Sequence, residues 1–290
     1  ERSELESGYF RELQNMLEHV AEQAWNVRCP GILLHGRTAA PGLASNRRIL
    51  RPDGTWGNEW SDPAGVHNGY CDTAVDLVGV QREGGKLEAL LVTFGCHPVC
   101  FGSMNQAISG DYVSYLKDSL EQAGDAGTVL FTVSGHANID PRECCQEDEN
   151  VVRAMGENLA AVIRPALSDL LPVEGSGTAG VREPWRFRTT WEPSGRLAIY
   201  FPHAARGSEV ETAVSVLSAG SLAMVGMPGE TVSEYREIIS GCSPFTHTLL
   251  ISLANDFIGY LPTDEILRQG AYEAALSPVD PIEEALTARV

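Results

Sequence analysis

The chain has 290 residues, 43% of them hydrophobic, and a formal net charge of -18 at pH 7. This composition supplies enough apolar side chains for the core of a globular protein. The negative charge argues against a nucleic-acid partner, and no run of apolar residues is long enough to predict a transmembrane segment.

The hydrophobic pattern predicts an alternation of helices and strands. Apolar residues at three- and four-residue spacing predict an amphipathic helix over residues 4–25, whereas residues 30–70 are rich in turn-forming residues and are expected to be irregular. Two strands joined by a glycine-containing hairpin are predicted at about 74–82 and 87–95. Further strands are predicted at about 128–133, 181–190, 211–217, 221–227 and 247–253, and helices at about 112–123, at 147–170 and after residue 230. We therefore predict an α/β fold with a mixed β-sheet core and flanking helices.

His97 follows an apolar strand directly, at a position where α/β proteins commonly bind ligands. Taken alone, a histidine between apolar residues is more commonly a hydrogen-bonded core residue. Cys96 and Cys100 lie close to it in the sequence. Consecutive strand residues face opposite sides, however, so we do not expect the cysteines to share a metal with His97.

Two further strands also end at polar residues. Glu230 follows a strand at a turn into a helix, where a carboxylate can simply complement the helix dipole. Tyr260 and Tyr272 follow another predicted strand, and tyrosines are usually packing residues. Together, however, a histidine, a carboxylate and a phenol at strand ends offer donors of the kind that catalytic zinc uses, with one further histidine required.

Several segments resemble the neutral/alkaline ceramidase family, in the same order and over nearly the whole chain. These segments are residues 45–48, 94–99, 108–112, 131–141, 227–230 and 253–273. The twelve-residue gap between Tyr260 and Tyr272 matches two functional tyrosines of the family. The resemblance implies that residues 1–290 form a single ceramidase-like catalytic domain.

The resemblance also implies the roles of individual residues. His97, Glu230 and Tyr260 would be zinc ligands, Arg47 would hold or polarise the substrate carbonyl, and Tyr272 would stabilise the tetrahedral intermediate. Without the resemblance, Arg47 would be interpreted as a surface charge. The implied activity is a zinc-dependent hydrolysis of the amide bond in an N-acyl substrate, ceramide-like or otherwise, by metal-activated water.

The sequence departs from the family at its N-terminal side. The family's first metal ligand lies in a histidine-rich H-T-H-S-G-P-type loop, which would come just before residue 1. We therefore expect a preceding segment, or a separate N-terminal chain, to supply that histidine. The family's C-terminal β-sandwich domain also has no counterpart in the sequence, which favours a soluble substrate over a bilayer lipid.

A second departure lies in the loop at residues 137–142, where Asp140 replaces an important serine of the family. A carboxylate there can bind a cationic or hydroxylated substrate, act as a general base or cap the loop, and Arg47 and Asn138 are further candidate substrate-binding residues.

Two alternative functions remain open. An amine could replace water at the same metal site, which would give a biosynthetic acyl-transfer or ring-closing enzyme. The fold could also serve a non-catalytic binding protein. The family's mostly exported members favour a secreted protein, although the seven cysteines do not settle the compartment.

Overall fold

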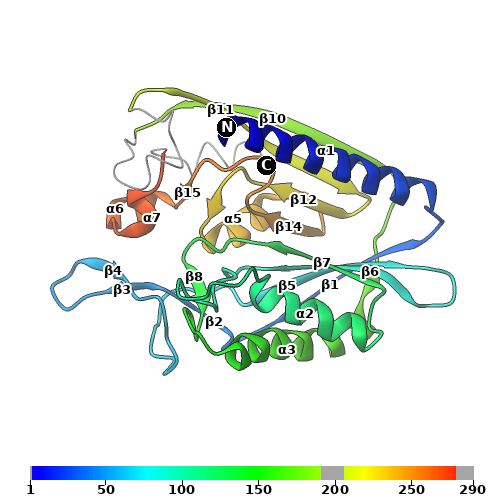
Figure 1. The fold of residues 1–290 in the computed structure, drawn as a ribbon, viewed down its shortest axis with the longest axis horizontal. Coiled ribbons are helices and arrows are strands. Elements are labelled where there is room, and N and C mark those ends of the chain that lie inside the picture. The colour runs from blue at the N-terminus through cyan, green and yellow to red at the C-terminus, as the bar shows by residue number, and fades with distance from the viewer. Residues whose placement is uncertain (1, 191–205, 279–290) are drawn as a thin grey trace.

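Two β-sheets and a pair of helices form three stacked layers in the computed structural model, which describes residues 2–190 and 206–278 (Figure 1). The first sheet has the strand order β7-β6-β5-β1-β9 and contains β1 (Ile32–Ala39), β5 (Ala74–Gln81), β6 (Leu87–Phe94), β7 (Thr128–Val133) and β9 (Leu171–Pro172). The second has the order β10-β11-β12-β14 and contains β10 (Thr178–Arg188), β11 (Glu209–Ala219), β12 (Leu222–Gly226) and β14 (His247–Ile251). Helices α2 (Asp111–Gln122) and α3 (Glu149–Ala166) cover the outer face of the first sheet (Figure 1). The mixed α/β fold predicted from the sequence is confirmed.

The first sheet is covered on both faces. Successive strand residues point to opposite sides, so each strand contributes side chains to both faces. Leu77 and Leu90 belong to the core beneath α2 and α3. Val78, the neighbour of Leu77, instead packs with Leu222 and Leu249 of the second sheet. The sheet therefore forms the middle layer and joins the two cores.

Strand directions bring two loops to one edge of this sheet. β5 and β6 form the antiparallel hairpin expected from the sequence, whereas β6 and β7 run parallel, with Phe94 paired to Val133. Parallel neighbours end at the same edge, so the loops that follow β6 and β7 emerge side by side.

The prediction that residues 30–70 are irregular is wrong. Strand β1 pairs with β5 along its whole length, and three short strands follow it: β2 (Ala44–Asn46), β3 (Arg48–Leu50) and β4 (Trp56–Asn58). His35, Gly36 and Arg37 interrupt the apolar pattern of β1, so the pairing with β5, which sequence periodicity does not report, stabilises this strand. Helix α3 also ends before residue 170, at Ala166, and a 3-10 turn (Leu167–Asp169) follows it.

The predicted N-terminal helix forms α1 (Arg2–Asn26), drawn in dark blue in Figure 1. From Tyr9 onward its large apolar residues are solvent-exposed, and Phe10, Leu17 and Trp25 each expose more than half of their surface. Among the described helices, none combines the length and the apolar character needed to cross a membrane.

Three short strand pairs hold the remaining segments at the sheet edge. β2 pairs with β8 (Ile139–Pro141), β3 with β4, and β13 (Glu230–Thr231) with β15 (Tyr260–Leu261). Helices α5 (Glu234–Cys242), α6 (Asp264–Gln269) and α7 (Tyr272–Ala275) complete the described fold. These pairings bring together most of the residues that the sequence marks as functional.

Candidate metal centre

Two histidines meet at the edge where β6 and β7 end. His97 follows Phe94 by three residues and His136 follows Val133 by three, and these two strand residues are paired across the sheet. The imidazole ring centroids lie 4.6 Å apart. The sequence pattern predicts His97 as a candidate ligand but not His136, although the matching positions of the two histidines after apolar strands are a usable signal.

Backbone hydrogen bonds fix the loop of His136 against the strand that carries Glu230. The amides of His136 and Ala137 both donate to the carbonyl oxygen of Thr231, at 2.8 and 2.9 Å. The amide of His97 donates to the carbonyl of Ile139 at 3.1 Å. Backbone hydrogen bonds therefore hold the loops of His97 and His136 and the strand of Glu230 together, without any contribution from side chains.

Glu230 and Tyr260 are direct partners in the parallel pair of β13 and β15. The close approach of these segments requires glycine beside Glu230, because a Cβ at Gly229 would lie 2.6 Å from the carbonyl oxygen of Gly259. Burial raises the pKa of the Tyr260 phenol, so the phenol keeps its proton near neutral pH and can donate to Glu230.

The tautomers of both histidines follow from their backbone partners. His97 Nδ1 lies 2.9 Å from the carbonyl oxygen of Ile139, and His136 Nδ1 lies 2.9 Å from that of Ser134. A carbonyl oxygen only accepts, so each Nδ1 carries a proton and Nε2 is the ring nitrogen left to bind a cation.

Both Nε2 atoms face the same carboxylate oxygen. Glu230 Oε2 lies 3.0 Å from His97 Nε2 and 3.8 Å from His136 Nε2. Burial lowers the pKa of His136 to about 3, so this ring is neutral at physiological pH. Burial acts to raise the pKa of Glu230, but the hydrogen bond with His97 and the two nearby histidines lower it overall. Two imidazole nitrogens and a carboxylate oxygen thus surround one point, and a cation at that point would be stabilised by all three atoms.

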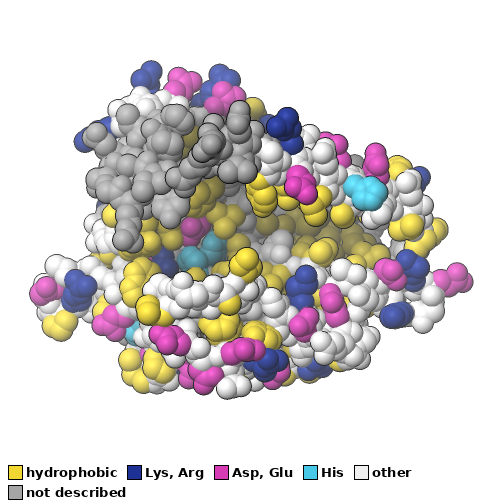
Figure 2. Space-filling view, viewed as in Figure 1, with side chains coloured by type: hydrophobic (Ala, Val, Ile, Leu, Met, Phe, Trp, Pro, Cys, Tyr) yellow, Lys and Arg dark blue, Asp and Glu magenta, His cyan; other side chains and the backbone are white. Residues whose placement is uncertain are grey.

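These residues fit a zinc ion in donor type and spacing. Imidazole nitrogen and carboxylate oxygen are ordinary zinc ligands, and tetrahedral zinc with bonds of about 2.0–2.2 Å places its ligand atoms about 3.3–3.5 Å apart. The distances from Glu230 Oε2 to the two Nε2 atoms, 3.0 and 3.8 Å, bracket that value. All three ligand atoms lie within 4.8 Å of one another. Figure 2 shows histidine side chains on the floor of a hollow, with acidic and basic side chains beside them.

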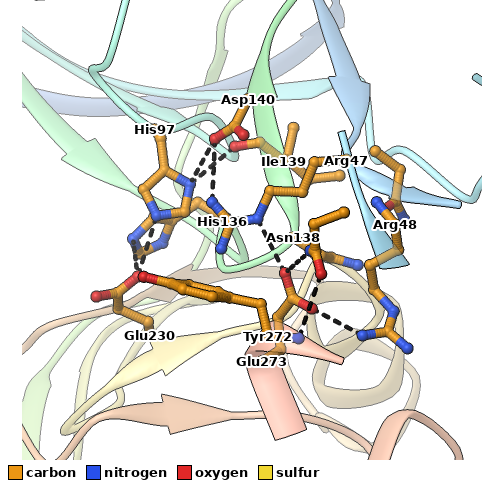
Figure 3. Close-up of polar contacts among 12 residues, drawn as sticks. Arg47, Arg48, His97, His136, Asn138, Ile139, Asp140, Glu230, Tyr272 and Glu273 are labelled. Atoms are coloured by element: carbon orange, nitrogen blue, oxygen red, sulfur yellow. Dashed lines mark hydrogen bonds and ion pairs between the residues drawn. The ribbon is translucent and has the colours of Figure 1, made fainter. Parts of the chain in front are cut away.

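Arg47 is a buried member of the site rather than a surface charge, with 4% of its surface exposed. Its Nε donates to Glu273 at 2.9 Å and its Nη1 lies 3.3 Å from Asp140 Oδ1. The same Asp140 oxygen lies 3.3 Å from His97 Nδ1 (Figure 3). Burial raises the pKa of Asp140, and the opposing charges of Arg47 and His97 do not fully offset this effect. Asp140 thus links the arginine to a histidine of the candidate metal centre.

Aromatic rings surround the guanidinium group of Arg47. Its central carbon lies 4.7 Å from the ring centroid of Trp60 and 5.1 Å from that of Tyr272. The ring of Tyr272 also meets that of Tyr260, with centroids 5.5 Å apart. Tyr272 remains 39% exposed, so its phenol lies at the boundary between the buried charges and solvent.

Comparison with known proteins gives a match in structure but not in sequence. No protein-family model and no curated protein matches the sequence. The fold matches the crystal structure of neutral ceramidase from Pseudomonas aeruginosa, with a TM-score of 0.68 and 15% identity over 89% of this chain and 50% of that one. A structure of a ceramidase complexed with C2 matches with a TM-score of 0.69 and 16% identity over 89% of this chain and 52% of that one. The chain has a ceramidase-like fold. It spans about half the length of the solved ceramidases that it matches.

Within this ceramidase-like fold, Asn138 is directed away from the histidines. Its Oδ1 accepts from the amide of Ser233 at 2.9 Å, and its Nδ2 donates to Glu234 at 3.2 Å. Both polar atoms therefore contact the start of α5. The other predicted site residues lie together around Glu230 and Arg47, whereas a substrate contact for Asn138 stays a prediction.

Proposed function

We propose that this chain forms part of a zinc-dependent hydrolase that cleaves the amide bond of an N-acyl substrate. The observation that carries the proposal is the convergence of two Nε2 atoms on the carboxylate of Glu230. His97, His136 and Glu230 would hold the ion, with Tyr260 beside them as a fourth candidate ligand. When bound, zinc lowers the pKa of a coordinated water to about 7 and polarises a carbonyl group.

The buried carboxylate of Asp140 orients the site. Together with the carbonyl of Ile139, it fixes His97 so that Nε2 faces Glu230. Carboxylates that orient ligating histidines in this way tune both the position and the basicity of the ligand. The replacement of a serine by Asp140 would therefore exchange a hydroxyl for a charge that holds His97 and Arg47 together.

Two buried polar atoms suit an amide group in the substrate. Arg47 Nη2 and Asp140 Oδ2 have no hydrogen-bond partner among the described residues. Unpaired buried polar groups cost free energy that a ligand can recover. An amide offers a carbonyl oxygen to the arginine and an N–H to the carboxylate, so this pair would recognise the bond to be cleaved.

An apolar groove beside the candidate centre supports an acyl substrate. A cavity of about 430 Å³ is lined by apolar residues that include Pro98, Phe131 and Leu253. Pro98 directly follows His97, and the amide of Leu253 donates to the carbonyl of Gly229, the residue before Glu230. The groove thus runs beside the backbone of two candidate ligands, where an acyl chain attached to the scissile carbonyl would lie.

Metal content and amide cleavage would be measured together to test the proposal. We expect about one zinc ion per chain and release of free acid from a series of N-acyl amines of increasing acyl length. Glu230→Gln should remove both the zinc and the activity, whereas Glu237→Gln, an exposed carboxylate on α5, should remove neither. A zinc-free native protein would overturn the metal assignment. Zinc binding without cleavage of any N-acyl amine would instead support the binding-protein alternative.

A further inference from the structure

Two adjacent cysteines that follow β8 in the chain form a close thiol pair. The Sγ atoms of Cys144 and Cys145 lie 3.0 Å apart. Cys144 is buried whereas Cys145 is exposed, so one member of the pair is accessible to reagents in solution. Cys145 has a φ of 61°, a backbone conformation that non-glycine residues seldom adopt.

The pair is fixed against the segment that follows His97. The carbonyl oxygen of Val99 accepts from the amide of Cys145 at 3.1 Å and from the Cys144 thiol at 3.4 Å. The amide of Gln146 donates to the carbonyl of Cys100 at 2.6 Å, and Phe101 forms a β-bridge with Gln146. Backbone contacts on this segment therefore hold the two thiols next to each other.

Adjacent cysteines can form only a strained disulfide. Their Cα atoms are about 3.8 Å apart across a trans peptide, below the range of about 4.4–6.8 Å found in most disulfides. Strained disulfides are easily reduced, and this lability is typical of regulatory rather than structural bonds. Burial also raises the pKa of Cys144, which leaves the exposed Cys145 as the first sulfur to react.

We propose that Cys144 and Cys145 form a reversible redox site that small-molecule disulfides such as oxidised glutathione convert to a vicinal disulfide. The Cys145 thiolate attacks the glutathione disulfide, and one glutathione leaves as its thiol with the proton from Cys145. The deprotonated sulfur of Cys144 then attacks Cys145 and expels the second glutathione, which takes the second proton. The two cysteines lose two electrons and two protons, and the glutathione disulfide gains both.

Trypsin provides a direct test, because cleavage after Arg142 and Arg153 yields a peptide with these two cysteines and no others. The native chain would be incubated with oxidised glutathione, alkylated to block free thiols, digested and analysed by mass spectrometry. We expect the peptide of residues 143–153 to be lighter by two hydrogens and to carry no alkyl group. Reduced glutathione should restore two alkylatable thiols.

Two variants serve as controls. Cys242→Ser, which removes a different exposed thiol, should leave the loss of two hydrogens unchanged. Cys145→Ser should abolish that loss and leave Cys144 as a free thiol. Two alkylated cysteines in the treated native peptide, or glutathione retained on Cys145 without ring closure, would overturn the proposal.

Discussion

Among the described residues, two pairs of histidines lie close together, each beside a carboxylate. His97 and His136 have ring centroids 4.6 Å apart at the sheet edge, and His35 and His247 have centroids 4.8 Å apart between the two sheets. The carboxylate of the first pair is Glu230. That of the second is Asp76, which lies 3.4 Å from His247 Nε2.

The two carboxylates differ in the counter-charge that the protein gives them. Arg37 Nε donates to Asp76 at 2.6 Å, so a permanent cation already neutralises this buried acid. At Glu230, the Nε2 atoms of two imidazoles face the carboxylate, and no arginine or lysine contacts it among the described residues. Ring proximity alone therefore does not indicate a metal site. The absence of an arginine or lysine beside Glu230, within the part of the chain that the structure describes, distinguishes the two clusters.

The largest expected effect is on zinc binding. His136→Ala removes one of the proposed zinc ligands and should weaken zinc binding by more than about 100-fold in a chelator-competition assay. His247→Ala, in the other pair, should leave the zinc affinity unchanged. Full retention of zinc by His136→Ala would instead favour a histidine from a preceding segment or separate chain, as the ceramidase resemblance implies.

A smaller loss is expected for the residue that orients His97. Asp140→Asn keeps the shape of the side chain but removes its charge, and should lower zinc affinity or amide cleavage by about 10–100-fold. Asp76→Asn is a matched control, because Asp76 is equally buried and also contacts an arginine. Equal losses in the two variants would show that buried charge in general, rather than the orientation of His97, sets the affinity.

The second cluster should contribute to the acid sensitivity of the zinc-free protein. Burial, with smaller effects from Arg37 and His35, lowers the pKa of His247 to about 4, against about 6.5 when unfolded. The unfolded chain therefore binds more protons between these values, and stability falls as the pH decreases from about 6.5 to 4. His247→Gln should remove about 2 kcal/mol of this decrease in urea unfolding measured at pH 7 and at pH 4.5. His19→Gln, on the exposed helix α1, should not.

The smallest effect is expected at the edge of the aromatic group around Arg47. Tyr272→Phe keeps the ring contacts with Trp60 and Tyr260 and removes only a hydroxyl group. Loss of one hydrogen bond of about 1 kcal/mol to the developing oxyanion should lower kcat about fivefold and leave KM unchanged. An unchanged kcat would exclude this phenol from transition-state stabilisation.

The sequence predicted the helices and strands that have a local hydrophobic pattern. It did not predict the strand and the site residue whose positions depend on strand pairing. The β5–β6 hairpin and helix α2 follow from hydrophobic periodicity and glycine-containing turns, whereas β1 depends on pairing with β5. Likewise, His97 follows a clearly apolar strand, but the site of His136 depends on the parallel pairing of β6 with β7. The direction of Asn138 towards α5 was equally beyond a sequence pattern, since it depends on where that helix begins.

The ion pair between Arg47 and Glu273 joins residues 226 positions apart in the chain. Contacts of such long sequence separation close a large loop, and their entropic cost must be met before they contribute any stability. Arg47, Arg48 and Glu273 are also almost completely buried, so neither arginine could be accommodated until α7 has docked. The candidate centre should therefore be among the last parts of the protein to assemble, and its capacity to take up zinc during refolding would report completion of the native fold.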